Sequence, residues 1–187
     1  MEIKQKVIKE LETVCHEDFI FASNTSSLPL TEMSKAAKKP ENVIGMHYFS
    51  PVPKMPLLEI IKTDQTSEET LATCYEIGKR QGKTCIVVND MPGFYVNRIL
   101  CPYLIEGLLM IEEGVRIEDI DGALTSLGMP IGPITLLDEV GIDVGAHVMS
   151  GNMAQLLKGR EGFKINYSMP KMFEAGLHGR KAKKGFY

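Results

Sequence analysis

The sequence contains no tryptophan, no long run of apolar residues and only four cysteines in 187 residues. A membrane-spanning helix needs about 20 consecutive apolar residues, so the sequence predicts no transmembrane segment. The four cysteines form no C-x-x-C pair and have no histidine at metal-ligand spacing; they are Cys15, Cys74, Cys85 and Cys101. We therefore expect reduced thiols, with no disulfide and no bound metal.

An excess of positive charge is also missing. The formal net charge is −3, which gives no reason to expect nucleic acid as a partner. The opening stretch "MEIKQKVIKELETVC" mixes lysine and glutamate evenly, unlike a signal or transit peptide. With 44% hydrophobic and 24% charged residues, the composition is that of an ordinary folded protein with a core.

Both common phosphate-binding glycine motifs are absent. Neither G-x-G-x-x-G nor G-x-x-x-x-G-K occurs anywhere in the 187 residues. The first of these motifs binds the pyrophosphate of a dinucleotide after the first strand of a doubly wound sheet. A sheet that binds a dinucleotide should carry it.

What the sequence does contain is a pattern of alternating helices and strands up to residue 90. Apolar residues recur with helical period over residues 2–15, and a second helix begins at Ser67 and ends at Gly82. A short helix is expected near Thr31, whose hydroxyl could act as its N-cap. Short apolar runs predict strands at residues 19–23, 42–49, 57–63 and 84–89; the first and last of these are expected to be buried.

After "DMPG" the pattern becomes entirely helical. Glycines and prolines separate predicted helices at residues 94–113, 117–127, 133–149, 152–158 and 168–175. The expected fold class is therefore α/β followed by all-α. We expect one domain over residues 1–90 and a helical domain over residues 91–187, with "NDMPG" between them.

One histidine and one glutamate stand out within "GMHYFSPVPKMPLLEII". If the strands on either side of this proline-rich loop pair antiparallel about Pro53, His47 lies directly opposite Glu59. Opposed side chains have Cβ atoms about 5 Å apart, and a carboxylate at that distance orients an imidazole and fixes its tautomer. The sequence thus predicts a general-base pair, with a plain structural ion pair as the alternative.

Two further polar stretches could contribute to a site. Ser26 follows a buried strand, where open α/β sheets bind ligands. Asn97 and Arg98 lie in the opening turns of the first long helix. Each also has a structural alternative, which is turn capping for Ser26 and a surface amide for Asn97.

Five ordered stretches together carry a resemblance that covers essentially the whole chain. They are "FASNTSSLP", "GMHYFSPVPKMPLLEII", "DMPGFYVNR", "GMPIGPITLLDEVGID" and "GRKAKKGFY". They resemble the L-3-hydroxyacyl-CoA dehydrogenases of fatty-acid β-oxidation, and "HYFSP" is most similar to the large subunit of the mitochondrial trifunctional protein and related multifunctional enzymes. The resemblance implies the last part of a Rossmann-type dinucleotide-binding domain followed by the family's helical C-terminal domain.

The same resemblance implies roles for individual residues. His47 matches the family's catalytic base, and Glu59 matches the carboxylate paired with it. Ser26 and Asn97 match residues that position the substrate and the nicotinamide. Ser50 stands where monofunctional members carry asparagine and multifunctional members carry serine, which puts an amide hydrogen bond from that position in doubt.

The activity implied is oxidation of 3-hydroxyacyl-CoA to 3-ketoacyl-CoA with NAD as the cofactor. In this family the glycine-rich loop precedes the segment that matches this chain. The chain is therefore expected to be a fragment that binds NAD weakly or not at all and is inactive by itself. The resemblance also implies a mitochondrial location and self-association, or internal packing, through the helical domain.

Two other functions stay open at this stage. One is a non-catalytic helical dimerisation or assembly module that retains the catalytic residues. The other is a dehydrogenase of the wider superfamily that acts on a free hydroxy acid. The basic ending "GRKAKKGFY" could contact a CoA phosphate, but we expect it to be a solvated tail.

Overall fold

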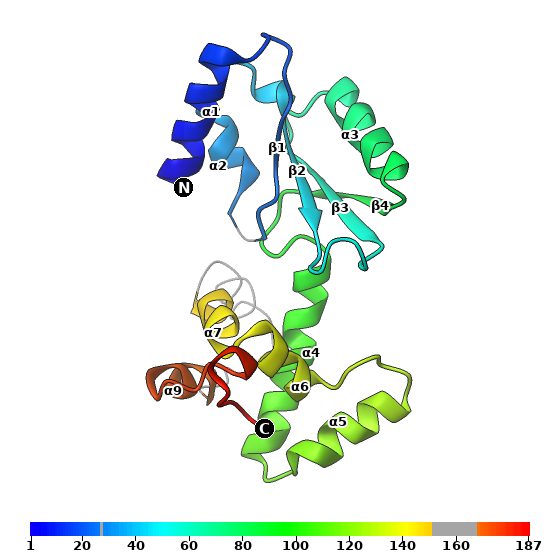
Figure 1. The fold of residues 1–187 in the computed structure, drawn as a ribbon, viewed down its shortest axis with the longest axis vertical. Coiled ribbons are helices and arrows are strands. Elements are labelled where there is room, and N and C mark those ends of the chain that lie inside the picture. Colours follow the sequence, from blue (N-terminus) through cyan, green and yellow to red (C-terminus); the bar gives the residue numbers. More distant parts are fainter. Residues whose placement is uncertain (27, 151–167) are drawn as a thin grey trace. The chain divides into compact units, whose positions relative to one another are not determined.

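The computed structural model describes residues 1–26, 28–150 and 168–187. It divides into two compact units, Met1–Tyr95 and Val96–Tyr187, which are described separately below. The first unit contains helices and a sheet, and the second contains helices (Figure 1). This agrees with the predicted α/β part followed by an all-α part.

The first unit is built on a four-stranded sheet in the order β1-β2-β3-β4. The strands are β1 (Phe21–Ser23), β2 (Val43–Tyr48), β3 (Leu57–Lys62) and β4 (Thr84–Asn89). The β1–β2 and β3–β4 pairs are parallel, whereas β2 and β3 are antiparallel. The antiparallel pair is the one that the proline-rich connection predicted.

Helices cover both faces of this sheet. Helices α1 (Glu2–Val14) and α2 (Leu30–Ser34) lie on one side and α3 (Glu68–Arg80) on the other (Figure 1). Side chains alternate between the faces along each strand, so two buried clusters form. One contains Ile8, Leu30, Met33, Ile61 and Phe94 on the α1–α2 side, and the other contains Ile44, Met46, Leu58, Ile60 and Cys74 on the α3 side.

A glycine in β2 permits the close packing of α2 on the sheet. A Cβ atom at Gly45 would lie 2.6 Å from Leu30 Cδ1 and 2.8 Å from Ile61 Cδ1. Both neighbours are fully buried, so neither could move aside without disturbing the core. The absence of a side chain at Gly45 thus brings α2 close to the strand that carries His47.

Three details of the predicted α/β part are wrong. Helix α2 begins at Leu30 with Pro29 in the N-cap position, and Thr31 is already inside the helix. The side chain that supports this helix start is Asp90, which accepts hydrogen bonds from the backbone N–H and the hydroxyl of Thr31, both at 2.7 Å. Strands β1 and β4 were both expected to be buried, but only Ser23 of β1 is buried and β4 has no buried residue, because these strands form the two edges of the sheet.

The N-cap predicted for α3 is confirmed. The Ser67 side chain accepts a hydrogen bond from the backbone N–H of Thr70 at 3.1 Å. The last turn ends at Gln81, and Gly82 follows with a φ of +74°, a left-handed conformation that glycine adopts without steric cost.

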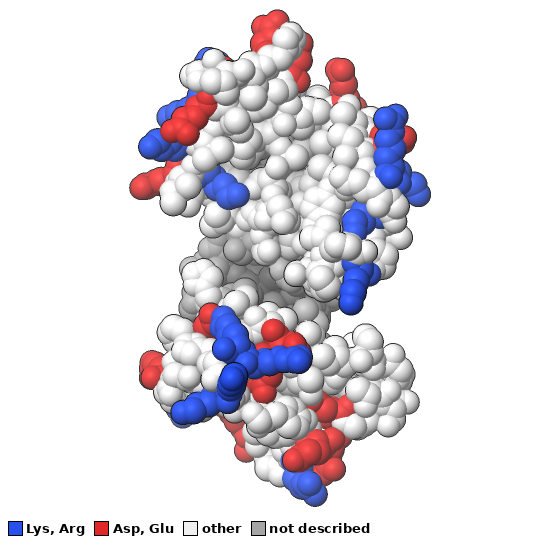
Figure 2. Space-filling view, viewed as in Figure 1, with Lys and Arg blue, Asp and Glu red and all other residues white. Residues whose placement is uncertain are grey.

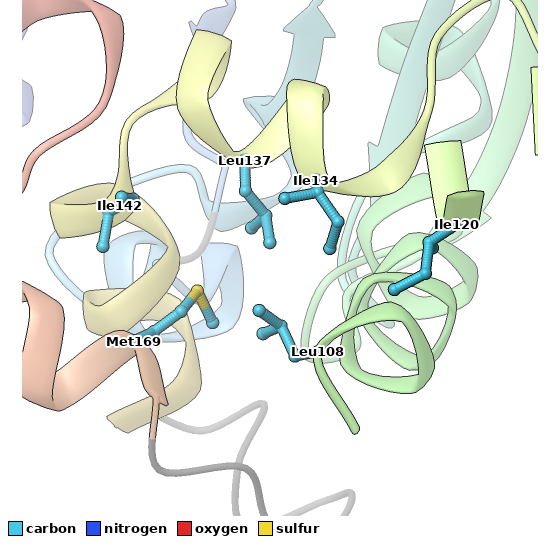
Figure 3. Close-up of a cluster of buried hydrophobic side chains, with 6 residues drawn as sticks. All are labelled: Leu108, Ile120, Ile134, Leu137, Ile142 and Met169. Carbon is cyan, nitrogen blue, oxygen red and sulfur yellow. The ribbon is translucent and has the colours of Figure 1, made fainter. Parts of the chain in front are cut away.

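The second unit packs five described helices around one cluster. They are α4 (Val96–Glu112), α5 (Ile117–Ser126), α6 (Pro133–Val140), α7 (Ile142–Ser150) and α9 (Ser168–Glu174). Each contributes to a core of Leu108, Ile120, Ile134, Leu137, Ile142 and Met169 (Figure 3). The helix predicted over residues 133–149 is in fact two, separated at Gly141, where φ is +106°. The helix predicted over 152–158 lies outside the described residues.

The basic ending of the chain is docked, which corrects the expectation of a solvated tail. A short 3₁₀ helix, Arg180–Ala182, sits in a loop closed by a bridge between Gly179 and Lys184. The backbone N–H groups of Phe186 and Tyr187 donate to the Asp138 carboxylate at 3.0 Å. Phe186 also packs against the core cluster.

No helix within residues 1–26, 28–150 and 168–187 is long and apolar enough to cross a membrane. Charged side chains of both signs occur on each unit over the face shown in Figure 2.

One buried carboxylate, Asp121 in α5, ties together three parts of the helical unit. It accepts hydrogen bonds from the backbone N–H groups of Ile134 and Thr135, from the Thr135 hydroxyl, and from the hydroxyl of Tyr187. Burial by itself would raise the pKa of Asp121, but these four donors outweigh it and lower the pKa below its ordinary value of 3.8.

The consequence is a pH-dependent contribution to stability. Because the folded-state pKa of Asp121 is lowered, its contribution is complete above the unfolded-state pKa and is lost as pH falls through the folded-state pKa. We expect Asp121→Asn to reduce the unfolding free energy of the helical unit by about 1–3 kcal/mol at pH 7. The difference from wild type should shrink below about pH 4.

Urea denaturation followed by circular dichroism at several pH values measures the loss of unfolding free energy and its change with pH. The control is Asp119→Asn, which changes an exposed carboxylate of the same helix. A difference that does not change with pH would contradict this account.

Candidate active site

The predicted pairing of His47 and Glu59 is confirmed. The two residues are directly opposite each other in the β2–β3 register. His47 Nδ1 lies 2.6 Å from Glu59 Oε2, and the residues are 4% and 0% exposed. The contact is therefore a short, buried hydrogen bond rather than the half-exposed ion pair of the alternative interpretation.

The second oxygen of the Glu59 carboxylate is also bound. Glu59 Oε1 accepts a hydrogen bond from the backbone N–H of Tyr95 at 2.9 Å. Tyr95 is the last residue of the first unit. The carboxylate is thus held from two sides, which fixes the direction in which Oε2 faces the imidazole.

Ser26 completes a chain of three polar side chains. Its Oγ lies 3.1 Å from His47 Nε2, on the opposite side of the ring from Glu59. The loop that carries Ser26 follows β1 and is held locally, because Asn24 Oδ1 accepts the Tyr48 N–H at 3.0 Å and Thr25 Oγ1 accepts the Leu28 N–H at 2.9 Å. The carboxyl ends of the parallel strands β1 and β2 therefore bring Ser26 to His47 as predicted.

Two aromatic rings enclose the imidazole. The Phe49 ring centroid lies 4.6 Å from that of His47 with the planes tilted by 55°, and the Phe94 centroid lies 5.7 Å away in an edge-type arrangement with the planes at 62°. Apolar walls keep water from the ring and strengthen the hydrogen bond between His47 and Glu59.

This arrangement is suited to proton transfer. An ionised carboxylate can only accept hydrogen bonds, so Glu59 favours the tautomer with the proton on Nδ1 of His47. Nε2 then presents its lone pair toward Ser26 and toward any hydroxyl that binds beside Ser26. A base oriented by a buried carboxylate is the arrangement that general acid–base catalysis uses.

The other two predicted site residues are Ser50 and Asn97. Ser50 is exposed at the start of the loop that joins β2 to β3. Asn97 is half-buried in the first turn of α4 and belongs to the second unit. Its proximity to His47 stays a prediction.

Sequence reasoning missed the Tyr95 N–H and the two aromatic rings. A backbone donor has no residue-type signal, so nothing in the sequence could have identified it. Phe49 and Phe94 lie within the quoted stretches "GMHYFSPVPKMPLLEII" and "DMPGFYVNR", and the nearness of both to polar candidates was the available signal.

Comparison with known families assigns the chain to a class of dehydrogenases. Residues 1–91 match the family model described as "3-hydroxyacyl-CoA dehydrogenase, NAD binding domain". Residues 93–187 match "3-hydroxyacyl-CoA dehydrogenase, C-terminal domain". The chain belongs to the 3-hydroxyacyl-CoA dehydrogenase family. The family domain that matches residues 1–91 is the one that binds NAD.

Curated relatives support this assignment along the whole chain. The chain is 46% identical over 190 residues to the fatty acid oxidation complex subunit alpha of Vibrio parahaemolyticus, and 51% identical over 187 residues to that of Shewanella sp. strain MR-7. All of this chain is covered in both cases, but only 26% of each relative. The chain thus spans about a quarter of the length of these relatives.

Solved structures show the same fold. The chain resembles M. tuberculosis FadB2 and the (S)-3-hydroxybutyryl-CoA dehydrogenase PaaH1 of Ralstonia eutropha, each with a TM-score of 0.93 and 36% identity. In both cases the match covers 100% of this chain and 66% of the other. The relatives named here are bacterial, so they give no support to the expected mitochondrial location.

The two hydrogen bonds of Glu59 make a testable contribution to stability. We expect Glu59→Ala to leave His47 Nδ1 buried without an acceptor, at a cost of about 1–3 kcal/mol, and to remove the acceptor of the Tyr95 N–H as well. Glu59→Gln retains a carbonyl acceptor and should cost less. Urea unfolding of both variants, followed by circular dichroism, measures the difference. A Glu59→Ala chain as stable as wild type would show that these contacts do not persist in solution.

Proposed function

We propose that this chain carries the proton-transfer residues of an L-3-hydroxyacyl-CoA dehydrogenase of fatty-acid β-oxidation. The observation that supports this most directly is the hydrogen-bonded chain Ser26–His47–Glu59, with distances of 3.1 Å and 2.6 Å. A buried carboxylate, an oriented imidazole and an accessible hydroxyl form the set of groups that removes a proton from a secondary alcohol.

In the proposed reaction His47 Nε2 accepts the proton of the substrate's C3 hydroxyl. Glu59 stabilises the imidazolium that results, because it already accepts the Nδ1 proton. Ser26 holds the C3 oxygen beside Nε2, and alignment of this kind can supply several kcal/mol of rate enhancement. In the reverse direction the same groups return the proton to the oxygen of a 3-ketoacyl-CoA.

NAD supplies hydride chemistry in this family. Ser26 and His47 lie at the carboxyl ends of β1 and β2. They fit the reactive end of such a cofactor, because the exposed Ser26 hydroxyl lies beside His47 Nε2, which can take a proton. Ser26 and His47 would therefore lie against the nicotinamide. The sequence contains no glycine-rich loop for the pyrophosphate, so we expect the isolated chain to bind NADH weakly.

The helical part, residues 91–187, is proposed to contribute substrate contacts, with Asn97 and Ser50 helping to position the reacting group. Self-association through this part is also proposed. Its described surface exposes several apolar side chains, Ile99, Leu127, Val140 and Phe173 among them, and a second copy could cover these.

The proposal is tested by NADH oxidation driven by acetoacetyl-CoA. We expect a rate close to background at ordinary NADH concentration that rises in proportion to NADH at higher concentration, because cofactor binding does not saturate. His47→Gln should lower the rate by about 10²-fold or more. The matched control is His16→Gln, which removes an exposed histidine outside the site and should leave the rate unchanged.

One result would count against this function. An equal rate above background in wild type and His47→Gln would mean that the oxidation does not use the proposed base. Complete absence of turnover would agree with the expectation that the chain is inactive by itself because it lacks the glycine-rich loop.

A further inference from the structure

We propose that Phe94 is a positioning residue that holds the His47 imidazole between Glu59 and Ser26. This inference rests on the proposed function of His47 as a base. Phe94 has no group that can accept or donate a proton, and its ring contact is with His47, so its effect would act through the orientation of the imidazole ring.

The contact geometry supports this role. The Phe94 and His47 rings form an edge-type contact with centroids 5.7 Å apart and planes at 62°. Phe49 lies against the imidazole at 4.6 Å. Rotation of a histidine ring about its Cβ–Cγ bond has only weak intrinsic preferences. The walls around His47 therefore help to decide which way its two nitrogens point.

The backbone of Phe94 is strained, which is unusual for a residue that merely fills a core. Its φ is +49°, in the left-handed region that a bulky residue occupies only at an energetic cost. The preceding Gly93 has a φ of +73°, which glycine adopts freely. A second glycine at position 94 would remove the strain but would also remove the ring that contacts His47.

Hydrogen bonds on both sides of Phe94 hold its backbone in this strained conformation. The Phe94 N–H donates to the Met91 carbonyl at 2.8 Å. On one side, the Tyr95 N–H donates to the Glu59 carboxylate. On the other side, Asp90 accepts both hydrogen bonds from Thr31 at the start of α2. Residues 90–95 are thus tied to the carboxylate that orients His47 and to the helix that follows the Ser26 loop.

The competing explanation is that Phe94 is only a core residue. It is 5% exposed and belongs to the same cluster as Ile8, Leu30 and Ile61. Phe21 of β1 packs against that cluster too, which makes it a matched control. Loss of core packing should affect Phe21→Leu and Phe94→Leu alike, whereas loss of positioning should affect only Phe94→Leu.

The first measurement is NMR of the chain labelled with ¹⁵N-histidine, which needs no cofactor. In wild type we expect a far-downfield Nδ1 proton on His47, because it lies in a short hydrogen bond to Glu59. In Phe94→Leu this signal should broaden or disappear as the ring moves and water reaches it. Phe21→Leu should retain the signal, and Phe94→Tyr, which keeps an aromatic ring, should restore it.

The second measurement is the acetoacetyl-CoA assay at one fixed, high NADH concentration. Phe94→Leu should lower the apparent kcat by about tenfold or more with little change in the KM for acetoacetyl-CoA, and Phe94→Tyr should recover most of the loss. If the wild-type chain shows no turnover, as expected of a chain without the glycine-rich loop, the NMR comparison decides the positioning role.

An unchanged Nδ1 proton signal in Phe94→Leu would overturn the inference, as would an equal loss of that signal in Phe21→Leu. If Phe94→Leu does not fold, the wild-type chain provides the decisive observation. Nuclear Overhauser contacts between the Phe94 and His47 ring protons support the proposal, and their absence rejects it.

Discussion

The α/β unit depends on a carboxylate buried in the middle of its sheet. Glu59 is fully inaccessible to solvent, and a buried carboxylate is costly unless its oxygens find donors. Here each oxygen has one, His47 Nδ1 on the neighbouring strand and the Tyr95 N–H at the end of the unit. Satisfying this group requires the β2–β3 register, the orientation of the imidazole and the path of the chain after β4 all at once.

Other features of the unit support the same arrangement. Gly45 lets α2 approach the strand that carries His47, since any Cβ atom there would meet Leu30 and Ile61. Asp90 fixes the start of α2 through Thr31, close in sequence to the loop that presents Ser26. Packing on one face of the sheet and polar contacts at its end thus both help to position the His47 ring.

Much of this could be predicted from the sequence because it depends on local patterns. Because the loop between β2 and β3 is centred on Pro53, the sequence predicted that His47 lies opposite Glu59. Ser67, which precedes α3, was likewise predicted as the N-cap of that helix. Features set by tertiary contacts could not be read in this way. Thr31 looked like an N-cap, but its role depends on Asp90, 59 residues away in the chain. The basic ending looked solvated, yet Asp138 binds its last two backbone N–H groups.

The central claim is that one carboxylate joins the histidine to the segment that ends the first unit. Hydrogen exchange of the Tyr95 amide in the wild-type chain tests it most directly, because Tyr95 is 53% exposed as a residue while its N–H donates to the buried Glu59 carboxylate. The account predicts that this amide exchanges as slowly as the strand amides of β3. Exchange at the rate of an unprotected loop amide would contradict it.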